Sequence, residues 1–266
     1  MTPLRWIDPA FLSFNALLLL ERAQLNWFPG WNWTASADLA IALHANPVVT
    51  WYLRHKCPEI AGWVDGLLTD HPARPVDPAE VRRAEVVVLG DLDDLLTYAV
   101  DPAAYDAQPF LGWDSTELTA LVDFAGKTVI DVGAGTGRLT LVAAETGAAA
   151  VFAAEPVANL RRYLREKARA RGLRNVFPVD GLITDLPFPD AFADVVMGGH
   201  VFGDEPEAEY AELARVVSPG GRIILCPGNG DRDDARHAFL IAAGFRWSRF
   251  EEPGDGMKRK YWQVSA

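Results

Sequence analysis

From Lys127 onward, the sequence alternates short apolar runs with stretches of helical character, and this alternation constrains the fold more than any other feature. Short apolar runs bounded by polar or turn-forming residues are typical of strands that are buried on both faces of a parallel sheet. The helical stretches between them supply the crossover connections that parallel strands need. We therefore predict a doubly wound α/β sheet. Its parallel strands are expected at residues 128–131, 150–155, 176–180, 194–197 and 222–226.

The end of the sequence predicts a different kind of strand pairing. Residues 245–251 and 258–264 flank the loop Pro253-Gly254-Asp255-Gly256, whose proline and glycines suit a turn between antiparallel strands. We expect these two segments to form a β-hairpin that joins the same sheet.

Residues 1–108 lack this strand pattern and predict a helical extension ahead of a domain at residues 109–266. Prolines punctuate segments that have helical character. In the last of them, residues 86–89 also fit a short strand, and that alternative stays open. The apolar stretch near residues 11–20 is too short to cross a bilayer and lacks the flanks of a signal peptide, so we expect a core helix and no membrane association. The helices are expected at residues 9–24, 35–45, 48–56, 59–68 and 78–100.

The charge balance and the cysteine content exclude several classes of protein. The 36 acidic and 25 basic residues give a net charge of −11, which repels a phosphate backbone, so nucleic acid is not an expected partner. The two cysteines, Cys57 and Cys226, have no pairing or ligand spacing and suit a reducing, cytoplasmic compartment. His44, His55 and His71, near Cys57, fit no familiar metal-ligand spacing, so we expect no metal site.

A glycine-rich turn is the most informative segment of the sequence. The predicted strand that ends at Asp131 continues into Gly133-Ala134-Gly135-Thr136-Gly137 and then into a helix. Glycine has no Cβ and tolerates unusual torsions, so such a turn lets the backbone approach a ligand closely. Arg138 stands where a dinucleotide-binding turn requires its third glycine, which argues against that class of site. A tight strand-to-helix turn without a ligand is the alternative.

Characteristic residues also end the strands that follow. Glu155 closes the second strand, where its carboxylate can accept two hydrogen bonds from a ribose diol or, alternatively, cap the helix that starts after Pro156. The third strand ends at Asp180-Gly181-Leu182, and the turn Leu186-Pro187-Phe188-Pro189-Asp190 follows it. Further on, Ser218-Pro219-Gly220-Gly221 leads a helix into the fifth strand.

The order of these segments resembles the class I S-adenosylmethionine-dependent methyltransferases, and the type 11 group in particular. The resemblance spans roughly residues 113–266 and rests on the glycine turn, Glu155, the turn at residues 186–190 and the Pro-Gly-Gly segment. It implies a Rossmann-like sheet of seven strands with the last strand antiparallel, and S-adenosyl-L-methionine as the methyl donor. It says very little about the acceptor.

The resemblance implies roles for individual residues. Asp131 and the glycine turn line the methionine side of the cofactor, Glu155 holds the ribose hydroxyls, and Gly198 at the end of the fourth strand passes beneath the sulfonium. The implied cofactor-binding residues are Asp131, Gly133, Ala134, Gly135, Thr136, Glu155, Pro156, Asp180, Gly181, Leu182 and Gly198.

The adenine end of the implied site departs from the family. Adenine is expected against Pro156 and near the turn at residues 180–182. The family's acid for the adenine amino group aligns with Leu182, whereas Asp180 lies two positions earlier. The role of Asp180 therefore stays open, and the backbone groups of Gly181 and Leu182 are the expected substitutes.

His200 is the candidate catalytic residue. A sulfonium methyl is already activated, so alignment and exclusion of water can supply most of the acceleration. A base is useful only if the acceptor is a hydroxyl or an acid, and His200 is then best placed because a neutral imidazole accepts a proton near pH 7. A histidine packed beneath the cofactor is the alternative. Tyr105, Asp106, Trp113 and Asp114 precede the first strand and are pocket candidates.

We expect methyl transfer to a small-molecule acceptor, with the aromatic-rich extension as a lid and substrate side. A protein methyltransferase and a non-catalytic S-adenosylmethionine-binding regulatory protein stay open as alternatives. The three functions differ in the space beyond the sulfonium. A small-molecule methyltransferase would have an enclosed pocket there and a protein methyltransferase an open groove, whereas in a regulatory protein side chains would block the space.

Overall fold

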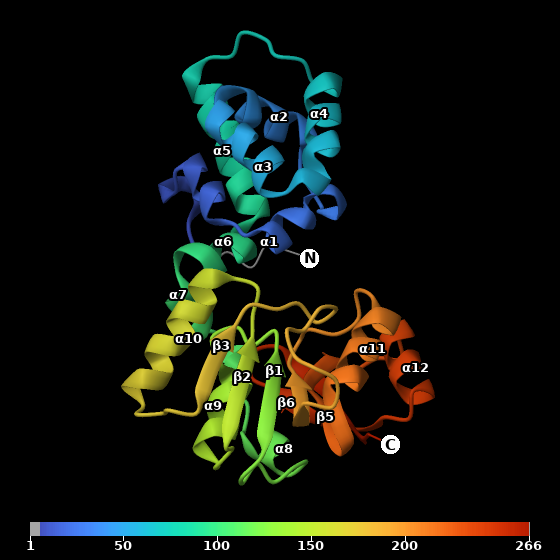
Figure 1. The fold of residues 1–266 in the computed structure, drawn as a ribbon. Helices are drawn as coiled ribbons and strands as arrows, with labels where there is room; N and C mark the ends of the chain where they lie inside the picture. Colours follow the sequence, from blue (N-terminus) through green and yellow to red (C-terminus); the bar gives the residue numbers. More distant parts are fainter. Residues whose placement is uncertain (1–5, 266) are drawn as a thin grey trace. The chain divides into compact units, whose positions relative to one another are not determined.

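The computed structural model describes residues 6–265 and divides after Tyr105 into two compact units (Figure 1). We call them the helical unit, up to Tyr105, and the sheet unit, from Asp106 onward. Each unit has a hydrophobic core of its own.

Helices form the helical unit, as the proline-punctuated sequence predicts. Prolines occupy the first positions of α3 and α5, where the missing N–H costs no helical hydrogen bond. Asp77 caps α5 by accepting a hydrogen bond from the backbone N of Glu80 at 2.8 Å. With η for 3₁₀ helices, the elements are η1 (Pro9–Phe11), η2 (Phe14–Leu19), α1 (Arg22–Asn26), η3 (Phe28–Gly30), α2 (Ser36–Ala45), α3 (Pro47–Lys56), η4 (Pro58–Ile60), α4 (Ala61–Asp70), α5 (Pro78–Asp91) and α6 (Asp93–Val100).

The prediction of one continuous helix at residues 9–24 is wrong. It consists of η1, η2 and the start of α1, because Leu12 has an extended backbone and the Ser13 hydroxyl caps a new helix start by accepting from Asn15 N. Leu17 in η2 is fully buried, so the segment still contributes to the core. Among residues 6–265, none of the helices combines the length and the hydrophobicity of a membrane span.

The last predicted helix of the extension, at residues 78–100, is divided in two. Leu92, with φ −105° and ψ 16°, leaves the helical region and separates α5 from α6. The alternative of a strand at residues 86–89 is wrong, since these residues lie within α5. The break places Asp93 at the start of α6, where its buried carboxylate accepts hydrogen bonds from the backbone N of Trp6 and Ile7.

Aromatic side chains build much of the helical unit's core. Phe28 is fully buried and meets the rings of Trp33 and Trp63 edge-on, with centroids 5.2 and 6.4 Å away. Trp33 and Trp31 also pack against this core, and their indole N–H groups donate to the backbone oxygens of Phe28 and Asp91. These tryptophans therefore combine apolar burial with a satisfied polar atom.

The sheet unit contains the predicted seven-stranded doubly wound sheet (Figure 1). Its strand order is β3-β2-β1-β4-β5-β7-β6, and β7 runs antiparallel to both neighbours. The strands are β1 (Thr128–Val132), β2 (Ala150–Ala154), β3 (Val176–Val179), β4 (Ala193–Gly198), β5 (Val217–Gly230), β6 (Arg246–Glu252) and β7 (Gly256–Val264).

Apolar residues of the strands point alternately to the two faces of the sheet, and helices pack against both faces. In β1, Val129 packs in a cluster with Leu139 of α9, whereas the next residue, Ile130, packs in a cluster with Leu213 of α11 and Leu240 of α12. This alternation follows from the two-residue period of a strand. The remaining helices are α7 (Pro102–Asp106), η5 (Pro109–Gly112), α8 (Thr116–Thr119), α9 (Arg138–Glu145), α10 (Ala158–Ala170), α11 (Pro206–Val216) and α12 (Ala235–Ala242).

We expect Phe28→Ala to destabilise the protein by about 3–5 kcal/mol, because it removes a fully buried ring and leaves a cavity against two tryptophans. Phe11→Ala is the matched control, since the Phe11 side chain is 88 % exposed and its loss is expected to change stability by no more than about 0.5 kcal/mol. Urea unfolding followed by circular dichroism measures both. Equal effects of the two substitutions would contradict the packing described here.

Candidate functional site

The strand order brings the predicted site residues to one edge of the sheet. β1 lies between β2 and β4, and all three run parallel, as does β3 beyond β2. The chain turns toward β2 after β1 but reaches β4 on the other side, so the crossover helices diverge beside the carboxyl end of β1. The segments that follow β1, β2, β3 and β4 contain the predicted residues at positions 131–136, 155–156, 180–182 and 198–200.

The glycine turn after β1 has the unusual backbone that its sequence predicts. Gly133, Gly135 and Gly137 have φ values of 64°, 54° and 92°, a region that residues with a side chain rarely occupy. Gly137 is also the N-cap of α9, and a Cβ there would lie 2.2 Å from Cδ1 of Leu164. Within the turn, Ala134 and Thr136 are buried. Glycine at position 137 is thus required by packing as well as by torsion.

Glu155 binds the backbone of the glycine turn directly. Its Oε2 accepts a hydrogen bond from Gly135 N and its Oε1 accepts one from Val157 N, both at 2.9 Å. Burial raises the pKa of this carboxyl group, and the two N–H donors oppose that rise. The capping alternative is not realised, because α10 has Val157 as its N-cap and no side-chain cap hydrogen bond. Glu155 instead links the glycine turn to the residue before this helix. Each oxygen of a carboxylate has a second acceptor site, so these two hydrogen bonds and the binding of a diol are compatible.

Asp131 is a buried carboxyl group with one unsatisfied oxygen. The Thr140 hydroxyl donates to Oδ2 at 2.5 Å, whereas Oδ1 is buried and has no hydrogen-bond partner within residues 6–265. Burial raises the pKa of Asp131 from 3.8 to about 7. An orphaned acceptor costs free energy until a donor or a cation reaches it. The ammonium group of an amino acid has the chemistry that this oxygen lacks.

The turn after β3 is more open than the turns after β1 and β2. The Asp180 side chain is 75 % exposed and pairs with Arg161 at 3.0 Å, and the same arginine donates to the backbone oxygen of Glu155 at 2.5 Å. The backbone N of Leu182 donates to Asp185 O, so it is not the free donor that the sequence led us to expect. Gly181 is confined by Pro187, whose Cδ would lie 2.9 Å from a Cβ.

His200 follows β4 and has a partner that the sequence did not predict. Its Nε2 lies 2.8 Å from Oε1 of Glu252, a carboxyl group without any exposed surface at the end of β6. Phe110 of η5 presents its ring edge-on to the imidazole, with centroids 6.0 Å apart. β6 is parallel to β4 because both β5 and β6 are antiparallel to β7. An acid at the end of the predicted hairpin's first strand is the signal that would have placed Glu252 at this edge.

The residues proposed from sequence as pocket candidates have structural partners. Trp113 is buried in the core with the Arg138 guanidinium 4.3 Å from its ring, and Asp114 accepts a hydrogen bond from Thr116 N. Asp106 accepts from Lys167 Nζ at 2.5 Å, which ties the start of the sheet unit to α10. Tyr105 packs on Trp6 and Tyr98 within the helical unit. Their positions follow from packing that a local pattern does not reveal.

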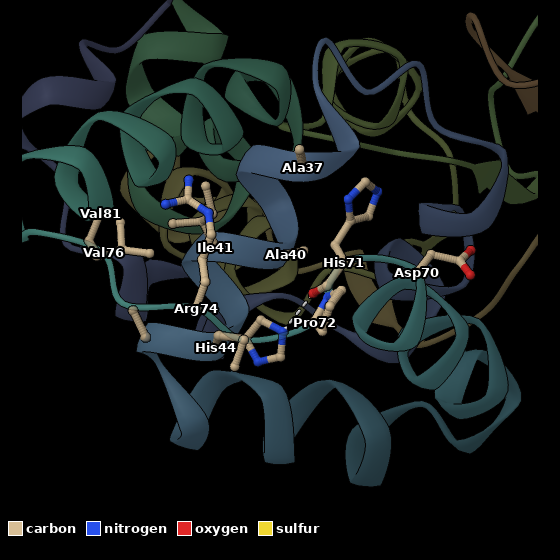
Figure 2. Close-up of a pocket in the computed structure, with 12 residues that line it drawn as sticks. Ala37, Ala40, Ile41, His44, Asp70, His71, Pro72, Arg74, Val76 and Val81 are labelled. Carbon is tan, nitrogen blue, oxygen red and sulfur yellow. Dashed lines mark hydrogen bonds between the residues drawn. The ribbon is translucent and has the colours of Figure 1, made fainter.

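A cavity of about 560 Å³ lies within the helical unit (Figure 2). Its wall consists of small and apolar residues of α2, Val76 and Val81, together with polar groups from the segment at residues 70–74. Nε2 of His44 lies 2.9 Å from the backbone oxygen of His71, and a dashed line marks this contact in Figure 2. No group of three or more metal-binding side chains gathers within residues 6–265. The cavity has the size of a small-molecule site.

Comparison with known proteins identifies the family. A family model described as a methyltransferase domain matches residues 130–225. An uncharacterized methyltransferase of Geobacillus kaustophilus is 30% identical over 166 residues, which make up 59% of this chain and 73% of that protein. The chain belongs to the class I S-adenosylmethionine-dependent methyltransferases. The resemblance drawn from its sequence is confirmed.

Two further comparisons place this methyltransferase among its relatives. It is 34% identical to the demethylmenaquinone methyltransferase of Thermus thermophilus over 139 residues, covering 50% of this chain and only 58% of that enzyme. A chain in the solved complex of the Haloferax volcanii Trm112 methyltransferase activator with a methyltransferase has the same fold, with a TM-score of 0.50 and 17% identity over 65% of this chain and 96% of that one.

The pKa of Asp131 predicts how the stability of the ligand-free methyltransferase depends on pH. Because the native state binds this proton more tightly than the unfolded state, the contribution of Asp131 to stability is fully present below pH 4 and is lost as the pH rises to about 7. Asp131→Asn cannot ionise, so its stability lacks this dependence on pH. When the pH is raised from 4 to 8, we expect the variant to gain about 2–4 kcal/mol of stability relative to the wild type. Urea unfolding at both pH values measures this change, and a constant difference would contradict the assignment.

Proposed function

We propose that the sheet unit binds S-adenosylmethionine across the carboxyl ends of β1, β2, β3 and β4, and that the enzyme methylates a small-molecule acceptor. The observation that carries this proposal is the buried, unsatisfied Oδ1 of Asp131 beside the glycine turn. A carboxylate in this position can hold the cofactor's ammonium group, and the turn without Cβ atoms leaves room for a ligand near the backbone.

The other cofactor contacts follow the order of the strands. Gly133, Ala134, Gly135 and Thr136 would line the methionine side, and Gly198 would lie beneath the sulfonium. On the other side of β1, Glu155 would accept hydrogen bonds from the ribose hydroxyls with its remaining acceptor sites. Pro156, Gly181 and Leu182 would surround the adenine, with Asp180 at the exposed rim.

The residues of this site bind and orient more than they react. The cofactor supplies an activated methyl group when it is bound. The chain's contribution is to hold the acceptor in line with that group, to exclude water, and to accept a proton where the acceptor carries one. His200 is the candidate for this last task because it is half-exposed at the end of β4, next to the proposed methyl position.

We expect calorimetry to detect binding of S-adenosylmethionine to the full-length chain. Glu155→Ala is expected to weaken that binding by about 2 kcal/mol, or about 30-fold in Kd, because it removes charge-assisted hydrogen bonds and loosens the turn at Gly135. Glu145→Ala, on α9, removes a carboxylate that only pairs with exposed Arg171 and serves as the control. A folded wild-type protein that binds neither S-adenosylmethionine nor S-adenosylhomocysteine would refute the proposal.

The acceptor is proposed to be a small molecule. The demethylmenaquinone methyltransferases of Thermus thermophilus and Clavibacter sepedonicus, both 34% identical, support this choice through their names. The net charge of −11 argues against a nucleic-acid acceptor. We propose further that the helical unit supplies the acceptor side, since every proposed cofactor contact comes from the sheet unit while the helical unit contains a cavity of suitable size.

A structure of the full-length chain with S-adenosylhomocysteine tests this division of labour. Side chains of the helical unit are expected to contact the space beyond the sulfur, where the transferred methyl group would have been. If only sheet-unit residues surround that space, the helical unit has another role and the acceptor site comes from the loops around His200 and the β6–β7 hairpin.

A further inference from the structure

The interaction between His200 and Glu252 has the arrangement of a proton acceptor with its orienting acid. Glu252 has no exposed surface, and its Oε1 lies 2.8 Å from Nε2 of His200. The other oxygen, Oε2, is buried without a hydrogen-bond partner within residues 6–265, and Nζ of Lys258, which also pairs with Asp255 at 2.7 Å, lies 3.5 Å from it. The buried acid thus contacts the imidazole through one oxygen and has a cation near the other.

The chemistry of the pair fixes the position of the imidazole's hydrogen. An ionised carboxylate only accepts hydrogen bonds, so Nε2 of His200 must carry the hydrogen of this contact. In the neutral ring, Nδ1 is then the unprotonated nitrogen and can accept a proton. Glu252 also stabilises the positive charge that forms when Nδ1 does so.

The backbone of His200 is held in a position that its side chain does not favour by itself. Its φ of 56° lies in the left-handed region, which is uncommon for residues other than glycine. The backbone N of His200 donates to Pro227 O at 2.9 Å, and the Phe110 ring lies nearly perpendicular to the imidazole. A sparsely populated conformation persists only where its surroundings determine it, and such positions cluster at functional sites.

We propose that Glu252 is a positioning residue that holds His200 as the base for an acceptor whose reacting atom loses a proton, such as a hydroxyl group. This inference rests on the proposed function. Methylation of a hydroxyl forms a C–O bond, breaks the C–S bond with its electron pair left on sulfur, and moves the hydroxyl proton to Nδ1 of His200. The proton then leaves to water, and the step needs no further reactant.

A purely structural role for Glu252 makes a different prediction. If the acid served only to anchor the hairpin through Lys258, the nitrogen that carries the hydrogen of His200 would not depend on it. Ion pairs link the imidazole to Glu252 from β6, and Glu252 to Lys258 from β7, which also pairs with Asp255 in the turn between these strands. Glu252→Gln and Asp255→Asn each remove one negative charge from Lys258, but only the first changes the partner of His200.

The test is ¹⁵N NMR of the ligand-free, full-length chain with labelled histidine, in which the resonances of His200 among five histidines are assigned with His200→Gln. We expect Nε2 to be protonated and Nδ1 to be unprotonated in the neutral ring. Glu252→Gln is expected to weaken this preference for the hydrogen on Nε2, because an amide can donate to that nitrogen as well as accept from it. Asp255→Asn is expected to leave the preference in place.

Three results would overturn the inference. The first is a neutral His200 with its hydrogen on Nδ1, and the second is a preference for Nε2 that Glu252→Gln leaves unchanged. The third is a preference that Asp255→Asn weakens equally, because the effect would then belong to the hairpin as a whole. Cofactor binding is measured separately by calorimetry. Its absence would refute the proposed function without altering the NMR result, so the two failures can be told apart.

Discussion

The reversal of winding beside β1 is the constraint on which the rest of the sheet unit depends. With β2 and β3 on one side of β1 and β4 and β5 on the other, the crossover helices diverge at the carboxyl end of β1. Short loops then deliver the glycine turn, Glu155 and His200 to this one edge, although 67 positions separate Gly133 from His200. The sheet interior has only to be apolar on both faces, so chemistry is concentrated where the strands end.

Three carboxyl groups at this edge are buried, and different partners offset the free-energy cost of burying each one. Asp131 meets a single hydroxyl and keeps one oxygen unsatisfied, and burial raises its pKa to about 7. Glu155 accepts hydrogen bonds from two backbone N–H groups. Glu252 contacts an imidazole, and its other oxygen also lacks a hydrogen bond within residues 6–265 but lies 3.5 Å from an ammonium group, whereas Asp131 has no charged partner there. Buried charge is costly without partners. The least compensated of the three is thus the one that a cationic ligand would stabilise most.

Local patterns explain how much of this fold and site could be predicted from the sequence. Strands buried on both faces appear as apolar runs, and the glycine turn and Glu155 each lie immediately after such a run, so their shared edge follows from topology alone. The interruption of the first helix at Leu12 was not predicted, because it depends on the capping of a new turn by Ser13. The structural roles of Trp113 and Asp106 were also missed, since their partners are Arg138 and Lys167.

The pair of His200 and Glu252 shows the same limit within the site itself. The two residues are 52 positions apart, and their strands are separated in the sheet by β5 and β7. Nothing in either local pattern links them. Their meeting requires that β6 run parallel to β4, which follows only once β7 is known to lie between β5 and β6 in antiparallel pairing. Once that topology is known, an acid at the end of β6 becomes a candidate partner for any residue that follows β4.

The separate cores of the two units bear on how such an enzyme can acquire a new acceptor. The family model matches residues 130–225, which contain the glycine turn, Glu155 and the end of β4 and lie wholly in the sheet unit. The helical unit packs its own cluster around Phe28, and a cavity lies between α2 and the start of α5. A substitution in that cavity changes no residue of the sheet's core. Residues of the cavity can therefore vary at little cost to the cofactor fold, whereas Gly137, with no room for a Cβ beside Leu164, cannot.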